Sequence, residues 1–167
     1  MPSAPLTGSG GHSPVFEDLA VGTELPPLTR GPLTTAHLMR WSSAMENWHR
    51  VHYDQQFTTG HDGLPSLLVS GSWKQHFLVQ MARRWLGPDG WLAEIGFEFR
   101  KMNLAGETLT AWGRVSAVEG RDELGLVTCE IGIRNQDGVE STPGTAVGAL
   151  PLRDGAGPVP YPFPEQW

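Results

Sequence analysis

One segment near the middle of the chain has the apolar spacing of a long helix. Between Ser72 and Leu86 the large apolar residues recur at intervals of three and four positions, at Trp73, Phe77, Leu78, Met81, Ala82 and Trp85. This spacing places them on one broad helical face, which other parts of the fold must cover. Gly87 and Pro88 follow directly and are expected to end the helix.

The second half of the chain has the shorter period of β-strands. Four extended segments are predicted, at Trp91–Met102, Leu109–Val118, Gly125–Asn135 and Val139–Leu150. In the third segment apolar residues alternate with polar residues or glycine, as in a sheet with one covered face, at Val127, Cys129, Ile131 and Ile133. Asp137-Gly138, between the last two segments, favours a hairpin.

The first half of the chain gives weaker patterns. Val15–Leu28 has the punctuation of a short strand followed by a loop. Thr34 or Thr35 is a candidate N-cap for a helix that continues to Ala44. Residues 47–70 have few periodic apolar positions, so we expect a loop with at most a short helix.

Length and composition predict one folded domain between two tails. A chain of 167 residues suits a single domain, which we place at residues 15–150. Residues 1–14 are rich in Gly, Ser and Pro, and residues 151–167 contain five prolines, so both are expected to be tails. The antiparallel strands must cover their apolar face with the one long helix, which predicts an α+β fold. Such a sheet leaves an edge and an incompletely covered face, which favours dimerisation.

Charge and cysteine content restrict the possible partners. The formal net charge of −6 argues against nucleic acid, because phosphate backbones require a basic surface. A single cysteine, Cys129, excludes an intramolecular disulfide and fits a reducing cytoplasm. No apolar run approaches the roughly 18 residues of a membrane span, and the N-terminus lacks the pattern of a signal peptide. We therefore expect a soluble, cytoplasmic protein without a membrane partner.

A cluster from Glu46 to Asp54 contains the densest group of chemically active side chains. It holds two histidines, two carboxylates and an arginine within nine residues. Histidine exchanges protons near neutral pH, so His49 and His52 are candidates for proton transfer, with an incidental surface loop as the alternative. Together with His61 these residues could ligate a metal, but no second cluster accompanies them, and no metal is predicted.

The residues that lead into the long helix could bind an oxyanion. A helix N-terminus presents free N–H groups and the positive end of a dipole. Gly71 would let a ligand approach the backbone closely. A thioester carbonyl held there would be polarised. The alternative is an ordinary capped helix, with Ser70 or Ser72 as its N-cap.

Taken together, these motifs resemble the MaoC-like acyl dehydratases, which include the R-specific enoyl-CoA hydratases. The resemblance covers about residues 15–150 and rests on Phe16–Gly22, His52-Tyr53-Asp54, Gly63-Leu64-Pro65, Ser70-Gly71 before a buried helix, and Leu104–Leu109. The string Asn-x-His-Arg-x-His-Tyr-Asp is similar to a branch that includes mesaconyl-CoA-type hydratases and hydroxyacyl-thioester dehydratases. The resemblance implies a hot-dog fold, with an antiparallel sheet wrapped around one long central helix. The implied reaction hydrates a trans-2-enoyl-CoA to a 3-hydroxyacyl-CoA, or reverses that step.

The resemblance also assigns roles at the site. In the family a carboxylate, followed five residues later by a histidine, holds the attacking water, which makes His52 the base here. Asn47 stands at the carboxylate position and can orient a water but cannot accept its proton. Gly71 N–H would polarise the carbonyl, Ser70 stands where the family has histidine, and His49 could assist His52.

The same resemblance implies the substrate and the assembly. Asp54, Trp73, Arg100 and Lys101 are the candidate substrate-binding residues. Arg100 and Lys101, like Arg83 and Arg84, would bind phosphates or form surface ion pairs. The substrate would be a CoA or acyl-carrier-protein thioester, with no further cofactor. A homodimer is expected, or a heteromer with a second MaoC-like chain.

Three other interpretations remain open from the sequence. A hot-dog thioesterase often has a carboxylate on or beside the central helix, but none occurs between Asp62 and Asp89. Asn47 and Ser70 are also compatible with a catalytically weak subunit that completes a heteromeric hydratase or only binds an acyl chain. The third is a MaoC-like dehydratase of a bulky biosynthetic intermediate, whose wide pocket would suit the seven tryptophans.

Overall fold

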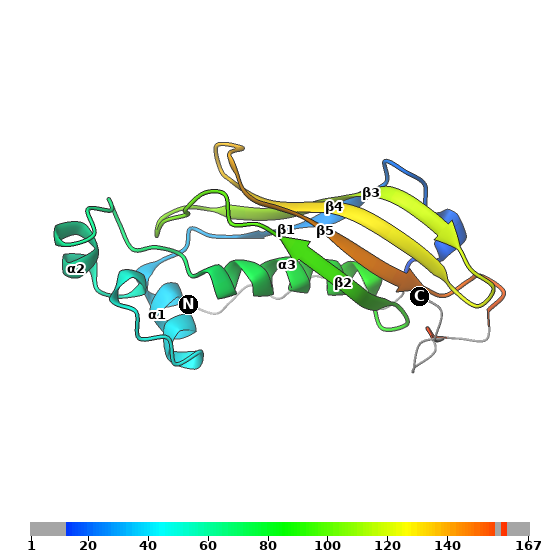
Figure 1. The fold of residues 1–167 in the computed structure, drawn as a ribbon, viewed down its shortest axis with the longest axis horizontal. Coiled ribbons are helices and arrows are strands. Elements are labelled where there is room, and N and C mark those ends of the chain that lie inside the picture. The colour runs from blue at the N-terminus through cyan, green and yellow to red at the C-terminus, as the bar shows by residue number, and fades with distance from the viewer. Residues whose placement is uncertain (1–12, 156–157, 160–167) are drawn as a thin grey trace.

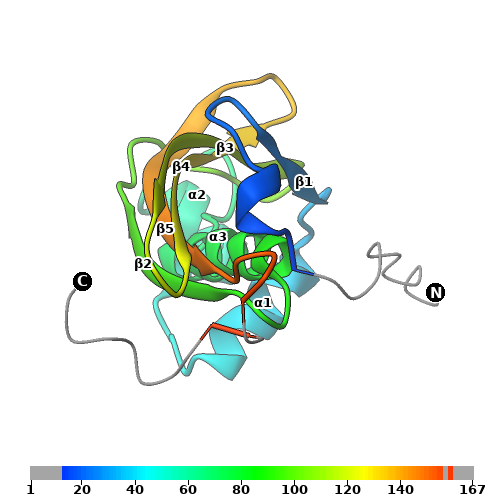
Figure 2. The same cartoon turned by 90° about the vertical axis from the view of Figure 1, so that its right-hand side faces the viewer.

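A five-stranded antiparallel sheet curves around one long helix in the computed structural model, which describes residues 13–155, 158 and 159 (Figures 1 and 2). The described elements in chain order are the 3-10 helix η1 (Phe16–Asp18), β1 (Glu24–Arg30), α1 (Thr35–Ala44), the 3-10 helix η2 (Arg50–His52), α2 (Gln55–Gly60), α3 (Gly71–Leu86), β2 (Trp91–Phe97), β3 (Leu109–Gly120), β4 (Gly125–Asn135) and β5 (Glu140–Leu150). The predicted α+β fold, with a sheet around one central helix, is confirmed.

The sheet has the strand order β1-β3-β4-β5-β2. Strands β3 and β4 pair from Leu109–Asn135 to Gly120–Gly125, and the β4–β5 hairpin turns at the predicted Asp137-Gly138. Gly138 has φ +75° there, a conformation that favours glycine. The edge strands β1 and β2 come from the first two-thirds of the chain, and each pairs with a later strand.

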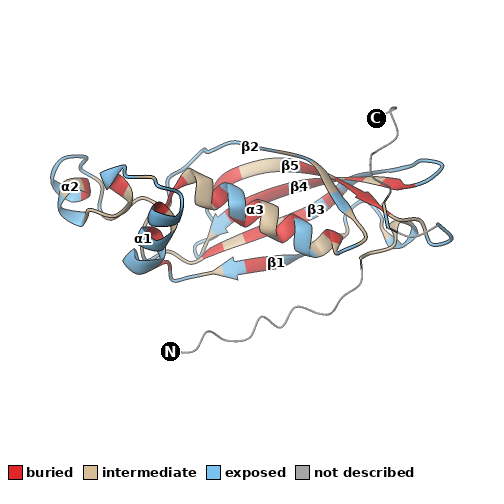
Figure 3. Cartoon of the chain, turned by 90° about the horizontal axis from the view of Figure 1, so that it is seen from below, coloured by how far each residue is buried: buried red, intermediate tan, exposed pale blue. Residues whose placement is uncertain are grey.

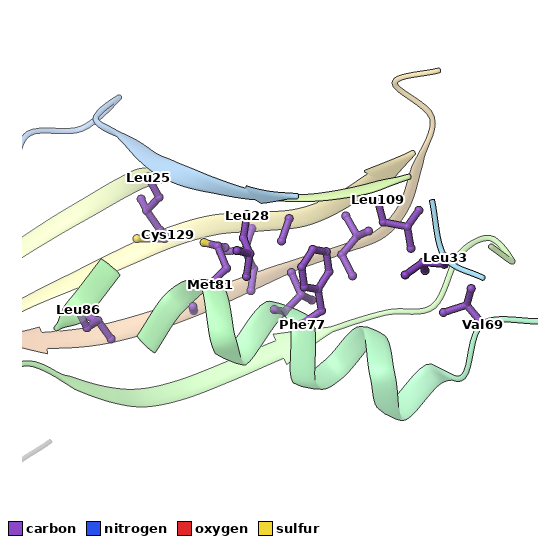
Figure 4. Packing of buried hydrophobic residues seen from close by; sticks show 14 of the residues in the cluster. Leu25, Leu28, Leu33, Val69, Phe77, Met81, Leu86, Leu109 and Cys129 are labelled. Carbon is purple, nitrogen blue, oxygen red and sulfur yellow. The ribbon is translucent and has the colours of Figure 1, made fainter. Parts of the chain in front are cut away.

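Helix α3 fills the concave side of the sheet with the face that its periodicity predicts. Phe77, Leu78 and Met81 are at most 2% exposed and pack against buried side chains of the sheet (Figure 4). Burying side chains of this size contributes about 1.5–3 kcal/mol each. The helix ends at Gly87, whose φ of +70° suits its C-cap position. Its opposite face lies between β1 and β2, and no other element that the structure describes covers it (Figure 3).

Two predicted strand boundaries are wrong. Strand β2 ends at Phe97 rather than Met102, because the N–H groups of Arg100 and Lys101 both donate to Ser141 O, outside the regular strand pairing. The first strand, β1, begins at Glu24 and includes the proline pair within Val15–Leu28. Proline is tolerated there because β1 is an edge strand, and its register with β3 shifts between Leu25 and Leu28.

The remaining predictions fall on loops and tails. Residues 47–70 contain η2 and α2 in a longer irregular segment, close to the expected loop with a short helix. Most of the predicted tails lies outside the described residues. Arg153, within the predicted C-terminal tail, donates from its backbone N–H to Glu17 and pairs with Asp18. None of the helices that the structure describes is long and apolar enough to span a membrane.

Candidate active site

A small pocket opens where α1, η2 and the N-terminus of α3 meet. It is lined by Leu33, His37, Leu38, Trp41, His52, Val69, Ser70 and Trp73. Its cavity volume of about 10 Å³ admits about one water molecule. Three of the predicted site residues, His52, Ser70 and Trp73, are therefore brought together, and they share the pocket with a histidine that the sequence motifs did not indicate.

A hydrogen bond to the backbone fixes the tautomer of the neutral His52 ring. Its Nδ1 lies 2.8 Å from Leu68 O. A carbonyl oxygen can only accept a hydrogen bond, so Nδ1 carries the proton and Nε2 of the neutral ring keeps its lone pair. The ring of His52 can therefore accept a proton at Nε2, as a general base must.

The neutral His37 ring has the other tautomer. Its Nδ1 accepts a hydrogen bond from the backbone N–H of Thr34, with an N···N distance of 3.1 Å. This contact belongs to the capping box of α1, in which the Thr34 side chain also accepts from His37 N–H. Because Nδ1 accepts, the proton of the neutral ring is on Nε2. His37 is thus a donor at the same pocket where His52 is an acceptor.

The start of α3 supplies unpaired backbone donors beside this pocket. Ser70 is the N-cap, but its Oγ lies 2.9 Å from Ser72 Oγ and does not cap the helix. Trp41 Nε1–H donates to the same Ser72 Oγ at 2.9 Å. Within the described part of the chain, the N–H groups of Gly71 and Ser72 donate to no other residue. These two N–H groups are available to a carbonyl oxygen.

A buried lysine supports the segment that positions His52. Lys74 is 3% exposed, and its Nζ donates to Lys101 O at 3.0 Å and to Asn103 Oδ1 at 3.4 Å. Asn103 O in turn accepts from Val69 N–H at 2.8 Å, next to the Leu68 carbonyl that binds His52. Burial lowers the pKa of Lys74 to about 8, against a smaller upward effect of a nearby carboxylate.

Asn47 and His49 lie outside the lining of the pocket. Asn47 Oδ1 accepts from His49 N–H at 3.2 Å, so the predicted water-holding oxygen is already bound to the backbone. His49 caps η2 through Nδ1, and its exposed ring lies 6.0 Å from the His52 ring between centroids. His49 therefore lies beside His52, the predicted base, whereas Asn47 Oδ1 is bound within its own loop.

The predicted substrate-binding residues separate into two groups. Trp73 lines the pocket and stacks on Phe77 with 4.8 Å between ring centroids. Asp54 instead caps α2 and pairs with Arg50 at 2.8 Å, and these hydrogen bonds lower the pKa of its carboxyl group. Arg100, which pairs with Glu98, and Lys101 are exposed beyond β2 and do not line the pocket.

The histidines and carboxylates of this region have separate partners. His61 pairs with Asp62 and stacks on Phe57, whereas Asp54 pairs with Arg50. Among the described residues, no group of three or more His, Cys, Asp or Glu side chains could hold a metal ion. The sequence could have indicated His37 only through its place three residues after Thr34, in a capping box, because the hydrogen bond that sets its proton depends on the folded helix.

The comparisons with known proteins agree with this architecture. Residues 25–107 match the family described as hydroxyacyl-thioester dehydratase type 2. No curated protein matches the chain at the level of sequence.

Several solved structures share the fold. The ChsH1-ChsH2 complex of Mycobacterium tuberculosis contains a chain 23% identical, with a TM-score of 0.68 over 78% of this chain and 98% of that one. The (R)-hydratase of A. caviae is 20% identical, with a TM-score of 0.70 over 81% and 99%. The R-hydratase PhaJ1 of Pseudomonas aeruginosa is 16% identical, with a TM-score of 0.73 over 84% and 87%. The solved structures show that the chain has the hot-dog fold of the MaoC-like hydratases, and the family match over residues 25–107, together with the motifs, places it among the hydroxyacyl-thioester dehydratases.

Proposed function

We propose that this chain interconverts a trans-2-enoyl thioester and a 3-hydroxyacyl thioester at the pocket between α1 and α3. The observation that carries the proposal is the hydrogen bond from His52 Nδ1–H to Leu68 O, which leaves Nε2 as an acceptor at this pocket. Family membership supports the same reaction class. Donors at the start of α3 supply the second requirement, a site for the carbonyl oxygen.

Substrate polarisation would depend on the first residues of α3. A thioester oxygen bound to Gly71 N–H and Ser72 N–H draws electron density from C3, which becomes electrophilic. The positive end of the helix dipole then stabilises the charge that develops on that oxygen. Trp73, which lines the pocket, would pack against the acyl chain.

Proton transfer would run through His52. In the hydration direction, Nε2 takes a proton from water while the water oxygen bonds to C3. The π electrons of the C2–C3 bond then form the enolate, with its charge on the thioester oxygen. C2 next takes the proton from His52 Nε2–H on the same face, and the carbonyl re-forms. Water and substrate supply every atom, so the proposed reaction needs no cofactor.

His37 would hold the water that Asn47 is not placed to hold. Its Nε2–H can donate to the water oxygen, which leaves the water protons free for His52 Nε2. The pocket has room for about one water molecule, which suits a site between two such rings. In the dehydration direction, the same N–H would stabilise the departing hydroxyl oxygen.

Assembly with a second chain is part of the proposal. The edge strand β2 pairs only with β5 within the described chain, and unpaired edges invite a further strand. Phe99 and Met102, which follow this edge, are 53% and 60% exposed. One of the similar structures is itself the complex ChsH1-ChsH2. We favour a homodimer formed through this edge.

A catalytically weak partner subunit is the second candidate. Two observations favour it: none of the described residues that line the pocket is a carboxylate, and Asn47 Oδ1 accepts a hydrogen bond from the backbone. Such a subunit would bind an acyl thioester and turn it over only together with another chain.

The test is hydration of trans-2-enoyl-CoAs of different chain length by the purified protein, followed by loss of enoyl-thioester absorbance. His52→Ala is expected to lower kcat/KM by about 10²–10⁴-fold, the usual effect of losing a general base. His37→Glu keeps an acceptor for Thr34 N–H but has no ring donor, so it should lower kcat while the fold is retained.

The matched control is His61→Ala, because His61 is exposed and paired with Asp62 away from the pocket. Wild-type activity is expected for it. Acyl-CoA binding without turnover would favour the partner subunit, and release of free thiol would favour a thioesterase.

A further inference from the structure

Two arginines beside the exposed face of α3 have no acidic partner. Six other arginines pair with a carboxylate within 4.0 Å, at positions Arg50, Arg100, Arg114, Arg121, Arg134 and Arg153. Within the part of the chain that the structure describes, Arg30 and Arg84 have no such partner, and the same holds for Arg40 and Arg83. Arg30 and Arg84 differ from those two because Arg30 contacts Gln80, one helical turn before Arg84. Partial burial and the charge of Arg84 lower the pKa of Arg30. Two guanidinium groups that repel each other without a counter-ion favour a bound anion.

The position of this pair relates it to the proposed active site. Arg30 ends β1, and its Nη2 lies 3.4 Å from Oε1 of Gln80 on α3. Trp73, Gln80 and Arg84 are spaced by seven and four residues, so they follow one row along the helix. Trp73 lines the active-site pocket at one end of this row. Trp73 and Gln80 are half-buried and Arg84 is exposed. The face of α3 between β1 and β2 is not covered by another described element (Figure 3).

The distance along α3 from Gly71 to the arginine pair is similar to the length of a phosphopantetheine arm. With the rise of an α-helix, Gln80 lies about 14 Å and Arg84 about 20 Å beyond Gly71 along the axis. A phosphopantetheine arm has about 13 bonds between its sulfur and its phosphorus, which corresponds to roughly 15 Å at the spacing of an extended chain. A thioester carbonyl at Gly71 N–H would therefore place the phosphate near the arginine pair.

We propose that Arg30 and Arg84 bind the 4′-phosphate of a phosphopantetheine arm that runs along the Trp73–Gln80 row. This inference rests on the proposed function, because it assumes a thioester carbonyl at the start of α3. Guanidinium groups suit a phosphate because their N–H groups match its oxygens in pairs. The 4′-phosphate is common to CoA and to acyl carrier proteins, so the pair would serve either carrier.

The first experiment measures binding without catalysis. Titration calorimetry compares 4′-phosphopantetheine with pantetheine, which lacks the phosphate, on wild type, Arg30→Gln and Arg84→Gln. Wild type is expected to bind the phosphorylated compound at least 10-fold more tightly, and each variant should lose most of that difference. Arg114→Gln is the control, because Arg114 pairs with Glu130 on the sheet and should leave binding unchanged. Equal binding of both compounds to wild type, or an equal loss in the control, would overturn the proposal.

The second experiment compares three carriers of the same enoyl group. With CoA and with a phosphopantetheinylated carrier protein, Arg84→Gln should raise KM about 10-fold, whereas the N-acetylcysteamine thioester, which has no phosphate, should be unaffected. An effect confined to CoA would place its adenosine phosphates there and contradict the proposal. If wild type turns over no thioester but still binds phosphopantetheine through the two arginines, the proposed function fails while the phosphate site remains. If turnover is normal and insensitive to both variants, the phosphate site fails alone.

Discussion

His37 and His52 line one pocket with their ring protons on different nitrogens, because each Nδ1 faces a different backbone group. Leu68 O can only accept a hydrogen bond from His52, and Thr34 N–H can only donate a hydrogen bond to His37. The local backbone therefore decides which ring can take a proton and which can give one. The backbone also determines what Asn47 can do, because Asn47 Oδ1 already accepts a hydrogen bond from His49 N–H.

Lys74 gives a prediction for the pH dependence of stability. Burial lowers its pKa from 10.5 in the unfolded chain to about 8 in the folded one. Between these two pH values the unfolded chain binds more protons at this group, so its contribution to stability rises as the pH rises. From pH 7 to pH 10 we expect wild type to gain about 1–3 kcal/mol in unfolding free energy relative to Lys74→Met.

Urea denaturation of both proteins at several pH values measures this difference. The comparison removes the contributions of all other titrating groups, because they are shared. Lys101→Met serves as the control, since the side chain of Lys101 is exposed, and its difference from wild type should not vary across this range. If the unfolding free energy of wild type minus that of Lys74→Met stays constant or falls between pH 7 and pH 10, the assignment is contradicted.

At the scale of elements, the first turn of α3 is packed against the chain that follows β2. A Cβ added at Gly71 would lie 2.9 Å from Cε2 of Phe99, closer than real side chains approach. The same ring lies 4.9 Å from Lys74 Nζ, measured to the ring centroid. The aromatic ring therefore restricts the residue at position 71 and covers the buried ammonium group.

This packing predicts a coupling between two substitutions. Gly71→Ala alone should destabilise the protein by about 1 kcal/mol, because the strain with Phe99 exceeds the helical preference for alanine. In a Phe99→Val background the same change should be neutral or stabilising. A double-mutant cycle from denaturation curves should give an interaction of about 0.5–2 kcal/mol. Additive effects would show that the ring moves aside freely.

The sequence predicts the elements whose periodicity agrees with their burial. Helix α3 and strand β4 match their predicted ranges within one residue. The prediction fails at β2, whose last predicted residues donate to Ser141 in a distant part of the chain. In the site, motif resemblance indicated His52 and Ser70, which line the pocket. The sequence motifs do not indicate His37, because its place in the lining of the pocket exists only in the folded chain.

At the scale of the whole molecule, the uncovered β2 edge predicts a dimer. Light scattering should give about twice the chain mass of 18.2 kDa. Phe99→Glu combined with Met102→Glu places charges beside this edge and should shift the protein toward the monomer. Val21→Glu is the control, because Val21 is 65% exposed and precedes the opposite edge strand. A monomeric wild type, or a double variant that stays dimeric, would contradict an interface at this edge.

The strand order also has a consequence for the synthesis of the chain. Both edge strands and α3 leave the ribosome before β3, β4 and β5, the strands that join the two edges. During that interval the apolar face of α3 has no sheet to cover it, and β1 and β2 have no partners. Their contacts are distant in sequence, and such contacts form late and expose the nascent chain to aggregation. The last third of the chain thus determines when folding can be completed.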